Sequence, residues 1–270
     1  MADHPGLGRV NIQRFRGGKG QLTEDVTAVE EPLDIRLCSA GRTRSVAITM
    51  RTPGRDTDLA LGFLFTEGVL TAGARVQCRE PKNNVVVAEP PAGQTIDWQR
   101  LERHSYTSSS CGVCGKTSLE QVYQSVPFAE QSARPQVPVQ LLPVLPDRLR
   151  AAQVLFDQTG GIHAAGLFSP TGELLHFAED VGRHNALDKL IGHFYAQDAL
   201  PLANHLLILS GRASFELVQK AGMAGIACVA AVGAPSSLAV GLAEELGITL
   251  CGFLSSRGFN CYSGAERLVN

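Results

Sequence analysis

The second half of the chain alternates short apolar runs with longer segments of helical period. The runs predict strands and the periodic segments predict helices. Because the runs are apolar throughout, we expect a sheet that helices cover on both faces. The expected order is helix, strand, strand, and then helices and strands in alternation, at residues 146–161, 162–169, 173–179, 180–194, 205–210, 213–225, 226–232, 235–247 and 248–253. The pattern therefore predicts a three-layer α/β/α sandwich.

Local signals place the ends of the first two helices. Pro146 and Asp147 start the first helix, because proline and short acidic side chains favour the first helical turn. The glycines at 160 and 161 end it. Asp180 lies at the start of the second helix, so we expect one continuous helix over 146–161 and another over 180–194.

The first half predicts a smaller mixed α+β unit. Residues 31–38 and 44–50 read as two strands of a hairpin, and residues 74–80 and 84–90 form a second hairpin. Between them, residues 55–70 predict a helix that Asp56 or Thr57 caps.

The Pro-rich stretch 133–146 suggests a division of the chain, since closely spaced prolines disfavour helix and suit an extended connector. We expect four parts. Residues 1–24 are polar and Gly-rich and predict a flexible leader, residues 25–132 form the α+β domain, residues 133–146 form the connector, and residues 147–270 form the α/β domain.

Composition narrows the class of protein. Hydrophobic residues make up 44% of the 270 residues, charged residues 19%, and the net charge is −2. This balance does not favour nucleic acid or membrane surfaces as partners. No apolar run has the length of a membrane span, and the N-terminus has no secretory signal. Seven scattered cysteines without such a signal predict a reducing, cytoplasmic setting.

Polar residues follow several predicted strands, at the ends where α/β sheets bind ligands. Serines and arginines there suit phosphate, as do helix N-termini. Each loop taken alone favours ordinary turn chemistry over a ligand site, and only the convergence of three such loops on one edge makes a phosphate pocket an equal alternative. The turn before the 180–194 helix is equally compatible with simple capping and with ligand binding. His163 is the only histidine on an apolar strand, and this position favours a buried core residue over a ligand. The candidate residues are Arg183, His184, Asn185, Ser210, Gly211, Arg212, Ser236, Ser237, Ser255, Ser256, Arg257 and Gly258.

Cys111 and Cys114 stand apart from the other cysteines because they lie among serines and glycines. Three hypotheses fit a C-x-x-C pair: half of a zinc site, a redox dithiol, or a nucleophilic thiol. A structural zinc site needs four ligands, and only His104 lies nearby. A thioredoxin-like pair opens a helix inside a βαβ unit, which this segment does not resemble.

The nucleophile hypothesis has local support. Thr117 and Glu120 fit a capping box, which would begin a helix just after Cys114. A helix N-terminus and the nearby Lys116 both stabilise a thiolate. The flanking glycines leave room for a large partner, so this segment suits the passing of a group between molecules.

Long stretches of the chain resemble the FdhD family of formate dehydrogenase accessory sulfurtransferases. The resemblance runs from about residue 25 to the C-terminus. The matching stretches are residues 28–37, 48–70, 109–116, 159–168, 179–192, 209–226, 234–253 and 256–268.

This resemblance implies a specific activity. Family members accept sulfur from a cysteine desulfurase as a cysteine persulfide. They transfer it to the Mo-bis(molybdopterin guanine dinucleotide) cofactor, which apo formate dehydrogenase requires. Cys111 matches the persulfide cysteine and Cys114 its partner. The stretch that matches the cofactor-binding segment consists of Phe253, Leu254, Ser255, Ser256, Arg257 and Gly258.

The resemblance also implies a cytidine-deaminase-like fold for the larger domain, a homodimer, and no catalytic metal ion of the protein's own. Cys114 would either resolve the transfer or accept the sulfur in turn. A second hypothesis remains open: a molybdenum-cofactor-binding chaperone whose C-x-x-C pair is structural or binds zinc. A third, a nucleotide-hydrolysing enzyme, finds no carboxylate cluster at the strand ends to support it.

Overall fold

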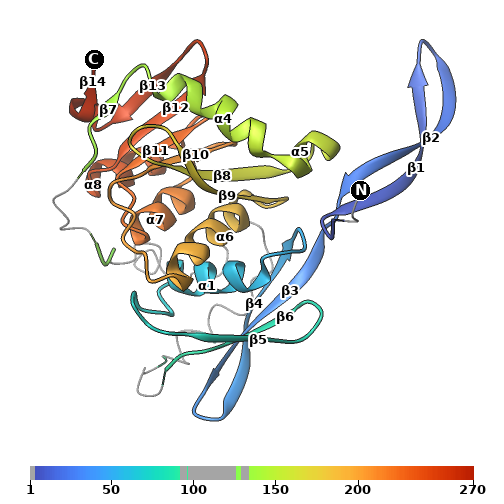
Figure 1. The fold of residues 1–270 in the computed structure, drawn as a ribbon, viewed down its shortest axis with the longest axis horizontal. Coiled ribbons are helices and arrows are strands. Elements are labelled where there is room, and N and C mark those ends of the chain that lie inside the picture. The colour runs from blue at the N-terminus through green and yellow to red at the C-terminus, as the bar shows by residue number, and fades with distance from the viewer. Residues whose placement is uncertain (1–3, 92–95, 97–125, 129–133) are drawn as a thin grey trace.

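A six-stranded mixed sheet forms the centre of the larger part of the molecule (Figure 1). The computed structural model describes residues 4–91, 96, 126–128 and 134–270. The strand order is β13-β12-β11-β10-β8-β9. Strands β10, β11 and β12 are parallel, while β8, β9 and β13 are each antiparallel to their neighbours. The strands are β8 (His163–Phe168), β9 (Leu174–Asp180), β10 (Leu206–Leu209), β11 (Cys228–Ala231), β12 (Thr249–Ser255) and β13 (Gly258–Ser263).

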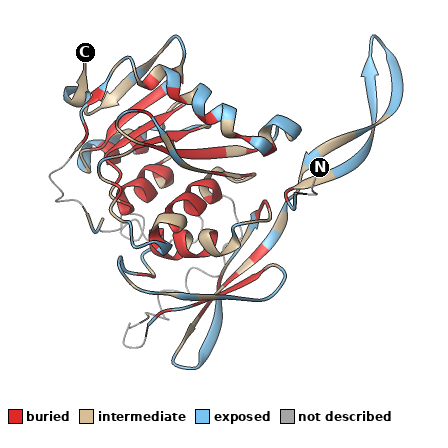
Figure 2. Cartoon of the chain, viewed as in Figure 1, coloured by how far each residue is buried: buried red, intermediate tan, exposed pale blue. Residues whose placement is uncertain are grey.

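Helices pack on both faces of this sheet. One face lies against α6 (Arg183–Ala196), α7 (Phe215–Met223) and α8 (Ser237–Glu245), and α1 (Asp56–Thr66) packs on α6 in the same large apolar cluster. The other face lies against η1 (Leu142–Val144) and α4 (Leu145–Ala152) in a smaller cluster. Figure 2 shows burial concentrated in the sheet and in the helices of the larger cluster. The predicted order of helices and strands in this half is therefore confirmed.

A four-stranded sheet with the order β4-β3-β6-β5 forms the smaller part. Its strands are β3 (Glu31–Ser39), β4 (Arg42–Arg51), β5 (Gln77–Lys82) and β6 (Val85–Glu89). Strands β3 and β4 form one antiparallel pair and β5 and β6 another, which confirms both predicted hairpins. The two pairs join through the parallel contact of β3 with β6.

Helices α1 and α6 join the two parts at very close range. Gly62 on α1 and Gly192 on α6 face each other. A methyl group on Gly62 would overlap the backbone carbonyl of Asp188, and one on Gly192 would overlap that of Asp58. Only glycine allows this approach of two backbones, so the smaller part is packed firmly against the larger one.

The start of α1 differs from the prediction. The N-cap is Arg55, which has a positive φ of 56° and makes no capping hydrogen bond with its side chain. Asp56 and Thr57, the expected caps, lie inside the first turn. The Arg55 side chain instead reaches β9, where its Nη1 donates to the backbone oxygen of Phe177 at 2.9 Å. A tertiary contact therefore outweighs the local capping signal.

The N-terminal segment is a β-hairpin where the sequence predicts a flexible leader. Strands β1 (Leu7–Arg16) and β2 (Lys19–Ala28) pair along their whole length and extend away from the rest of the molecule (Figure 1). Gly17 and Gly18 both have positive φ values and form the two-residue turn. A Gly-Gly pair between two runs of alternating apolar and polar residues is a hairpin signal. The sequence therefore held a pattern that predicts this hairpin, although the polar composition favoured a flexible leader.

The Pro-rich connector is packed into the fold over its described residues, 134–146. Val137 lies in the two-residue strand β7 (Val137–Pro138), which pairs in parallel with β14 (Leu268–Val269) beyond the short η2 (Ala265–Arg267). Val137, Leu142 and Leu145 are buried in the smaller cluster. The connector is thus part of the core as well as a link between halves.

The first helix of the larger part is interrupted where one continuous helix is predicted. Helix α4 ends at Ala152 and α5 (Val154–Thr159) begins two residues later, with Gln153 between them at φ −77° and ψ 89°. No helix among the described residues is long and apolar enough to cross a membrane.

Candidate functional site

The topology of the large sheet gathers the predicted strand-end loops at one edge. Parallel strands β10, β11 and β12 all end there. Because β8 runs opposite to β10, its first residue, His163, lies at the same edge and pairs with Asp180 at the end of β9. The turn from β12 to β13 closes the edge at Gly258. The candidate residues from four distant segments therefore lie along one rim.

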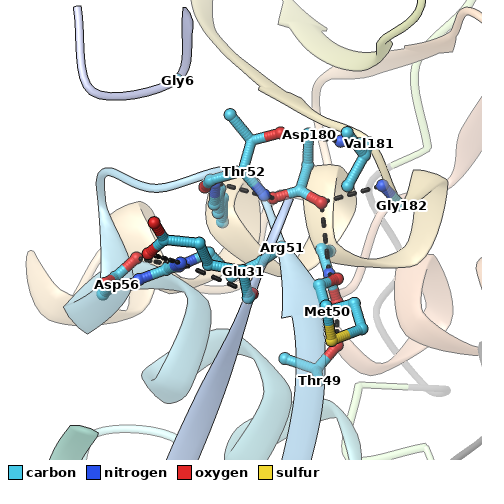
Figure 3. Close-up of polar contacts among 12 residues, drawn as sticks. Gly6, Glu31, Thr49, Met50, Arg51, Thr52, Asp56, Asp180, Val181 and Gly182 are labelled. Atoms are coloured by element: carbon cyan, nitrogen blue, oxygen red, sulfur yellow. Dashed lines mark hydrogen bonds and ion pairs between the residues drawn. The ribbon is translucent and has the colours of Figure 1, made fainter. Parts of the chain in front are cut away.

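Asp180 organises the turn that leads into α6 (Figure 3). Its Oδ1 accepts hydrogen bonds from the backbone N of Gly182 at 2.8 Å and from Nδ2 of Asn185 at 3.2 Å. Its Oδ2 pairs with Nζ of Lys189 at 2.7 Å and accepts from the backbone N of Thr52 at 3.1 Å. Asp180 and Lys189 are both buried. This network fixes the position of the α6 N-terminus against β4.

A second layer of polar contacts holds the end of β4 in the same place (Figure 3). Asn185 Nδ2 donates to the backbone oxygen of Met50 at 2.7 Å, and Lys189 Nζ donates to that of Thr52 at 2.7 Å. The buried Arg51 forms a two-pronged pair with Asp56, through Nε at 2.9 Å and Nη2 at 2.7 Å. Asn185, a strand-end candidate, thus acts as a structural link.

The α6 N-terminus presents Arg183 and His184 to the rim. Arg183 is half-buried, and its buried Nε has no hydrogen-bond partner among the described residues. His184 Nε2 lies 3.3 Å from Oγ of Ser214 and 3.9 Å from Oε2 of Glu216. Hydrogen bonding to His184 lowers the pKa of Glu216 to about 2. His184 is therefore engaged with α7, whereas Arg183 retains an unsatisfied donor.

The loop after β10 supplies Ser210 and Arg212. Ser210 Oγ accepts a hydrogen bond from the backbone N of Ala164 at 2.8 Å, and this contact ties β10 to β8. Arg212 is exposed and forms no hydrogen bond or ion pair within the part of the chain that the structure describes. Gly233, after β11, packs against its backbone: a methyl group there would lie 2.9 Å from the Cα of Arg212.

The β12–β13 turn contains the segment Phe253–Gly258. Leu254 is buried in the smaller cluster, so its side chain is not available to a ligand. Ser256 and Arg257 are exposed. Ser255 Oγ accepts from the backbone N of Arg257 at 3.3 Å, which shapes the turn.

Phe253 has an unusual conformation for an aromatic residue. Its φ is +53°, its side chain is 53% exposed, and its backbone N donates to the oxygen of Gly233 at 3.2 Å. A positive φ is rare for bulky residues, and such conformations cluster at functional sites. The fold therefore holds Phe253, with a strained backbone and an exposed aromatic ring, at the rim.

His163 is a rim residue that the sequence placed in the core. It is half-buried, and Gly211 lies against its ring, since a methyl group on Gly211 would be 3.3 Å from the imidazole. Burial lowers the pKa of His163, and the positive charges of Arg183 and His184 lower it further. Its imidazole is therefore neutral near pH 7. The sequence feature that could have placed His163 at the rim is its position shortly after Gly160 and Gly161, at the start of a strand.

An open cavity of about 580 Å³ lies beside this rim, on the face of the sheet that α4 covers. His163, Ser210 and Val232 line its sheet side, and Gln153 and Phe156 line its helix side. The sequence did not predict this cavity, because it forms where the expected single helix is interrupted.

Cys111 and Cys114, with His104, Lys116 and Thr117, lie outside the described residues. The other cysteines are described. Cys228 and Cys251 are buried, and Cys38, Cys78 and Cys261 are half-buried. Burial raises the pKa of Cys78 to about 11 and that of Cys228 to about 12, and it also raises that of Cys251. These thiols are therefore poor nucleophiles at neutral pH.

Three comparisons with known proteins agree. A protein-family model, the FdhD/NarQ family, matches residues 28–269. The chain is 49% identical over 279 residues to the sulfur carrier protein FdhD of Streptomyces coelicolor, with 97% of each chain covered. It is 46% identical to the sulfur carrier protein FdhD of Mycobacterium tuberculosis, and this match covers 91% of this chain and 92% of the relative. It is 39% identical to the sulfur carrier protein FdhD of Saccharolobus solfataricus, and this match covers 96% of this chain and 97% of the relative.

A solved structure shares the fold. The crystal structure of a formate dehydrogenase accessory protein from Desulfotalea psychrophila superposes with a TM-score of 0.76 at 22% identity, covering 98% of this chain and all of that one. The family match spans nearly the whole chain, and the relatives align over nearly their full lengths. The chain belongs to the FdhD/NarQ family.

Proposed function

We propose that this protein is a sulfur carrier in the maturation of formate dehydrogenase. It accepts sulfur from a cysteine desulfurase on Cys111 and delivers it to the Mo-bis(molybdopterin guanine dinucleotide) cofactor, which apo formate dehydrogenase then receives. The names of its relatives support sulfur transfer, and the rim described above supports the docking of an anionic, nucleotide-containing cargo. The setting is a reducing cytoplasm and the assembly a homodimer.

One observation supports the docking of the cargo most strongly. The rim of the large sheet collects Arg183, Arg212 and Arg257 together with the N-termini of α6, α7 and α8. Neither α6 nor α7 has a side-chain cap at its N-terminus. Uncapped N–H groups and arginine forks both favour phosphate. A pyrophosphate that links a guanosine to a pterin would satisfy these donors, and Phe253 offers an exposed ring beside them.

Sulfur loading is a thiol exchange that needs no outside oxidant. The Cys111 thiolate attacks the outer sulfur of the desulfurase persulfide. The donor's S–S bond breaks, the donor cysteine leaves as a thiolate, and a new S–S bond forms on Cys111. Because the described cysteines are buried or half-buried and several have raised pKa values, we assign this step to Cys111.

Delivery has two balanced routes through Cys114. In the first, the Cys114 thiolate attacks the inner sulfur of the persulfide, which forms a Cys111–Cys114 disulfide and releases hydrosulfide to the molybdenum. A cellular dithiol then reduces the disulfide. In the second, the Cys114 thiolate attacks the outer sulfur, the Cys111 thiolate leaves, and Cys114 becomes the persulfide. A cellular thiol then attacks the inner sulfur of that persulfide, which releases hydrosulfide to the molybdenum and leaves a mixed disulfide on Cys114 that a second thiol reduces. Loss of two hydrogen masses from the protein after turnover indicates the first route.

The test of loading is the intact mass of the purified protein after incubation with a cysteine desulfurase and cysteine. The wild-type chain should gain the mass of one sulfur atom, which a reductant removes. Cys111→Ala should gain none, whereas the control Cys38→Ala should load normally. Normal loading of Cys111→Ala, or stoichiometric zinc with no loading of the wild type, contradicts the proposal and favours the cofactor-binding chaperone with a structural C-x-x-C pair.

The test of docking is the affinity for GDP. Arg183→Gln, Arg212→Gln and Arg257→Gln should each weaken binding about tenfold or more, since a hydrogen bond to a charged group contributes about 1.5–3 kcal/mol. Arg42→Gln, at the exposed start of β4 in the other sheet, is the matched control. Unchanged affinity for GDP in all three rim variants would contradict the proposal that the rim binds the phosphates of the cargo. The cytidine-deaminase-like layering of the larger part also remains a proposal.

A further inference from the structure

Three of the described cysteines gather in the smaller apolar cluster, on the face of the sheet that α4 covers. Cys228 lies on β11, Cys251 on β12 and Cys261 on β13, so three neighbouring strands each contribute one thiol. All three thiols are free. A buried free cysteine usually acts as a small apolar residue, but two thiols within reach of each other can also react together. The strand register decides which two are within reach.

Cys251 and Cys261 occupy directly opposite positions on the antiparallel strands β12 and β13. Residues in such a pair have Cα atoms about 4.5–5.5 Å apart and side chains on the same face, and a disulfide needs Cα atoms about 4.4–6.8 Å apart. Cys228 is instead paired with Thr249, and Cys251 with Ala230, so Cys228 and Cys251 are out of step along their strands. The register therefore suits a disulfide between Cys251 and Cys261.

The thiols of Cys251 and Cys261 already contact each other. The S–H group of Cys251 donates a hydrogen bond to the sulfur of Cys261, and Sγ of Cys261 donates to the backbone oxygen of Ser263 at 3.2 Å. The strand ladder has a register shift on each side of the pair, and such irregularities let a strand bend. The closer approach that an S–S bond requires therefore does not have to break a regular ladder.

An outside reagent meets Cys261 first. Cys261 is half-buried, whereas Cys251 is buried. Burial raises the pKa of Cys261, but the hydrogen bond from Cys251 and the positive charge of Arg267 oppose this effect. Burial also raises the pKa of Cys251, and the neighbouring sulfurs of Cys228 and Cys261 raise it further. Because the thiolate is the reactive form, Cys261 is the better nucleophile of the two, and its partial burial favours a small oxidant.

We propose that Cys251 and Cys261 form an oxidation-sensitive pair that hydrogen peroxide converts into a disulfide. Cys261 loses its proton and attacks one peroxide oxygen, the O–O bond breaks, and the departing hydroxide takes up that proton to form water. Cys251 then attacks the sulfur of the resulting sulfenic acid, the S–O bond breaks, and the hydroxyl leaves with the Cys251 proton as a second water. A cellular dithiol reverses the reaction by exchange. Disulfides of this kind in a reducing cytoplasm are transient and respond to oxidants.

The disulfide would close a loop that contains the β12–β13 turn. The segment Phe253–Gly258 lies between the two cysteines and belongs to the rim. A cross-link at the base of a turn restricts its opening, so the amide hydrogens of residues 253–258 should exchange with solvent at least about threefold more slowly in the oxidised protein. The inference does not rest on the proposed function, because neither the pair nor its oxidation requires a bound cargo.

Peptide mapping under non-reducing conditions tests the pair, after the full-length protein is treated with hydrogen peroxide and its remaining thiols are blocked. Trypsin cleaves after Arg257, so the peptide that contains Cys228 and Cys251 separates from the peptide that contains Cys261 unless a disulfide joins them. The wild type should give the joined peptides, which a dithiol reductant separates. Cys261→Ser and Cys251→Ala should each give none. Cys228→Ala, which alters the other cysteine of the same peptide, is the matched control and should keep the joined peptides.

Three results would overturn the inference. The first is a wild-type protein without joined peptides, in which Cys261 is unmodified or oxidised to a sulfinic acid. The second is the loss of the joined peptides in Cys228→Ala, which would assign the disulfide to Cys228. The third is an unchanged exchange rate for residues 253–258 after oxidation, which would mean that the disulfide does not restrict the turn. Thermal unfolding of each variant verifies that it is folded.

Discussion

The two faces of the central sheet are built differently. The face under α6 and α7 is sealed. Helix α1 packs on the outer side of α6, where Gly62 and Gly192 bring the two helix backbones into contact, and the buried pairs Asp180–Lys189 and Asp188–Lys220 keep the charges there paired. The face under α4 and α5 is open, because the helix is interrupted at Gln153 and a cavity remains. We conclude that the sealed face holds the rim in position, while the open face offers space for a ligand.

Because the sealed face has the closest packing, we expect Gly192→Ala to lower the free energy of unfolding more than any other substitution that we propose for the two faces. A methyl group there would overlap the backbone carbonyl of Asp58, which no side-chain rearrangement can relieve. We expect a loss of more than about 5 kcal/mol of unfolding free energy, an exceptional cost for one substitution. Urea denaturation measures it.

Gly241→Ala on α8 is the matched control for this substitution. A methyl group there meets nothing within 4 Å, so alanine should leave stability unchanged or raise it by up to about 1 kcal/mol. Similar stability of the two variants would mean that the α1–α6 contact is not as close as the structure has it.

Lys220→Met should have the second largest effect. Lys220 pairs with Asp188 at 2.9 Å and donates to Thr66 Oγ1 at 2.8 Å, and Lys220 and Asp188 are both buried. Removing the lysine leaves a buried carboxylate without its partner, which costs about 3–5 kcal/mol.

The double variant Lys220→Met with Asp188→Leu sharpens this prediction. With both charges removed, much of the lost stability should return, because a buried apolar pair can replace a buried ion pair. A double variant that is no more stable than Lys220→Met alone would show that the loss comes from packing and not from the unpaired charge.

His176 should make the sealed face sensitive to acid. Its ring stacks on His193 at 3.7 Å and lies 2.7 Å from Nη1 of Arg55, with Phe194 at its edge. Burial lowers its pKa to about 4, and the nearby positive charges of His193 and Arg55 add to this. Because the unfolded chain then binds more protons, stability should be complete above pH 6.5 and should fall between pH 6.5 and about 4.

His176→Phe keeps a ring in the stack and removes the titration. Over that pH window the wild type should lose about 1–2 kcal/mol more than the variant. Thermal unfolding at a series of pH values measures the difference, and parallel curves for the two proteins would argue against this role of His176.

On the open face the smallest effect is expected, and it should have the opposite sign. Gln153→Leu removes a buried donor that has no described partner, so it should raise the unfolding free energy by about 1 kcal/mol. A loss of stability instead would mean that Gln153 has a structural partner and that the two faces differ less than we conclude.

The pattern of apolar and polar residues along the chain predicted much of this fold. The alternation of strands and helices after residue 146 and both hairpins of the smaller part are confirmed, because burial imposes its period on the sequence. The clustering of Arg183, Ser210, Arg212 and Arg257 at one rim also followed from strand order. Whether Cys111 and Cys114 act as proposed stays a prediction.

The sequence by itself determined which segments become strands and helices and which loops hold polar side chains, since these depend on neighbours along the chain. The tertiary structure decided the features that depend on distant partners. Glu179 interrupts the helix at Gln153 from another strand, Arg55 begins α1 through a contact with β9, and Gly62 requires Gly192 across the helix interface. Contacts between residues far apart in the chain leave no local period, so only the folded structure reveals them.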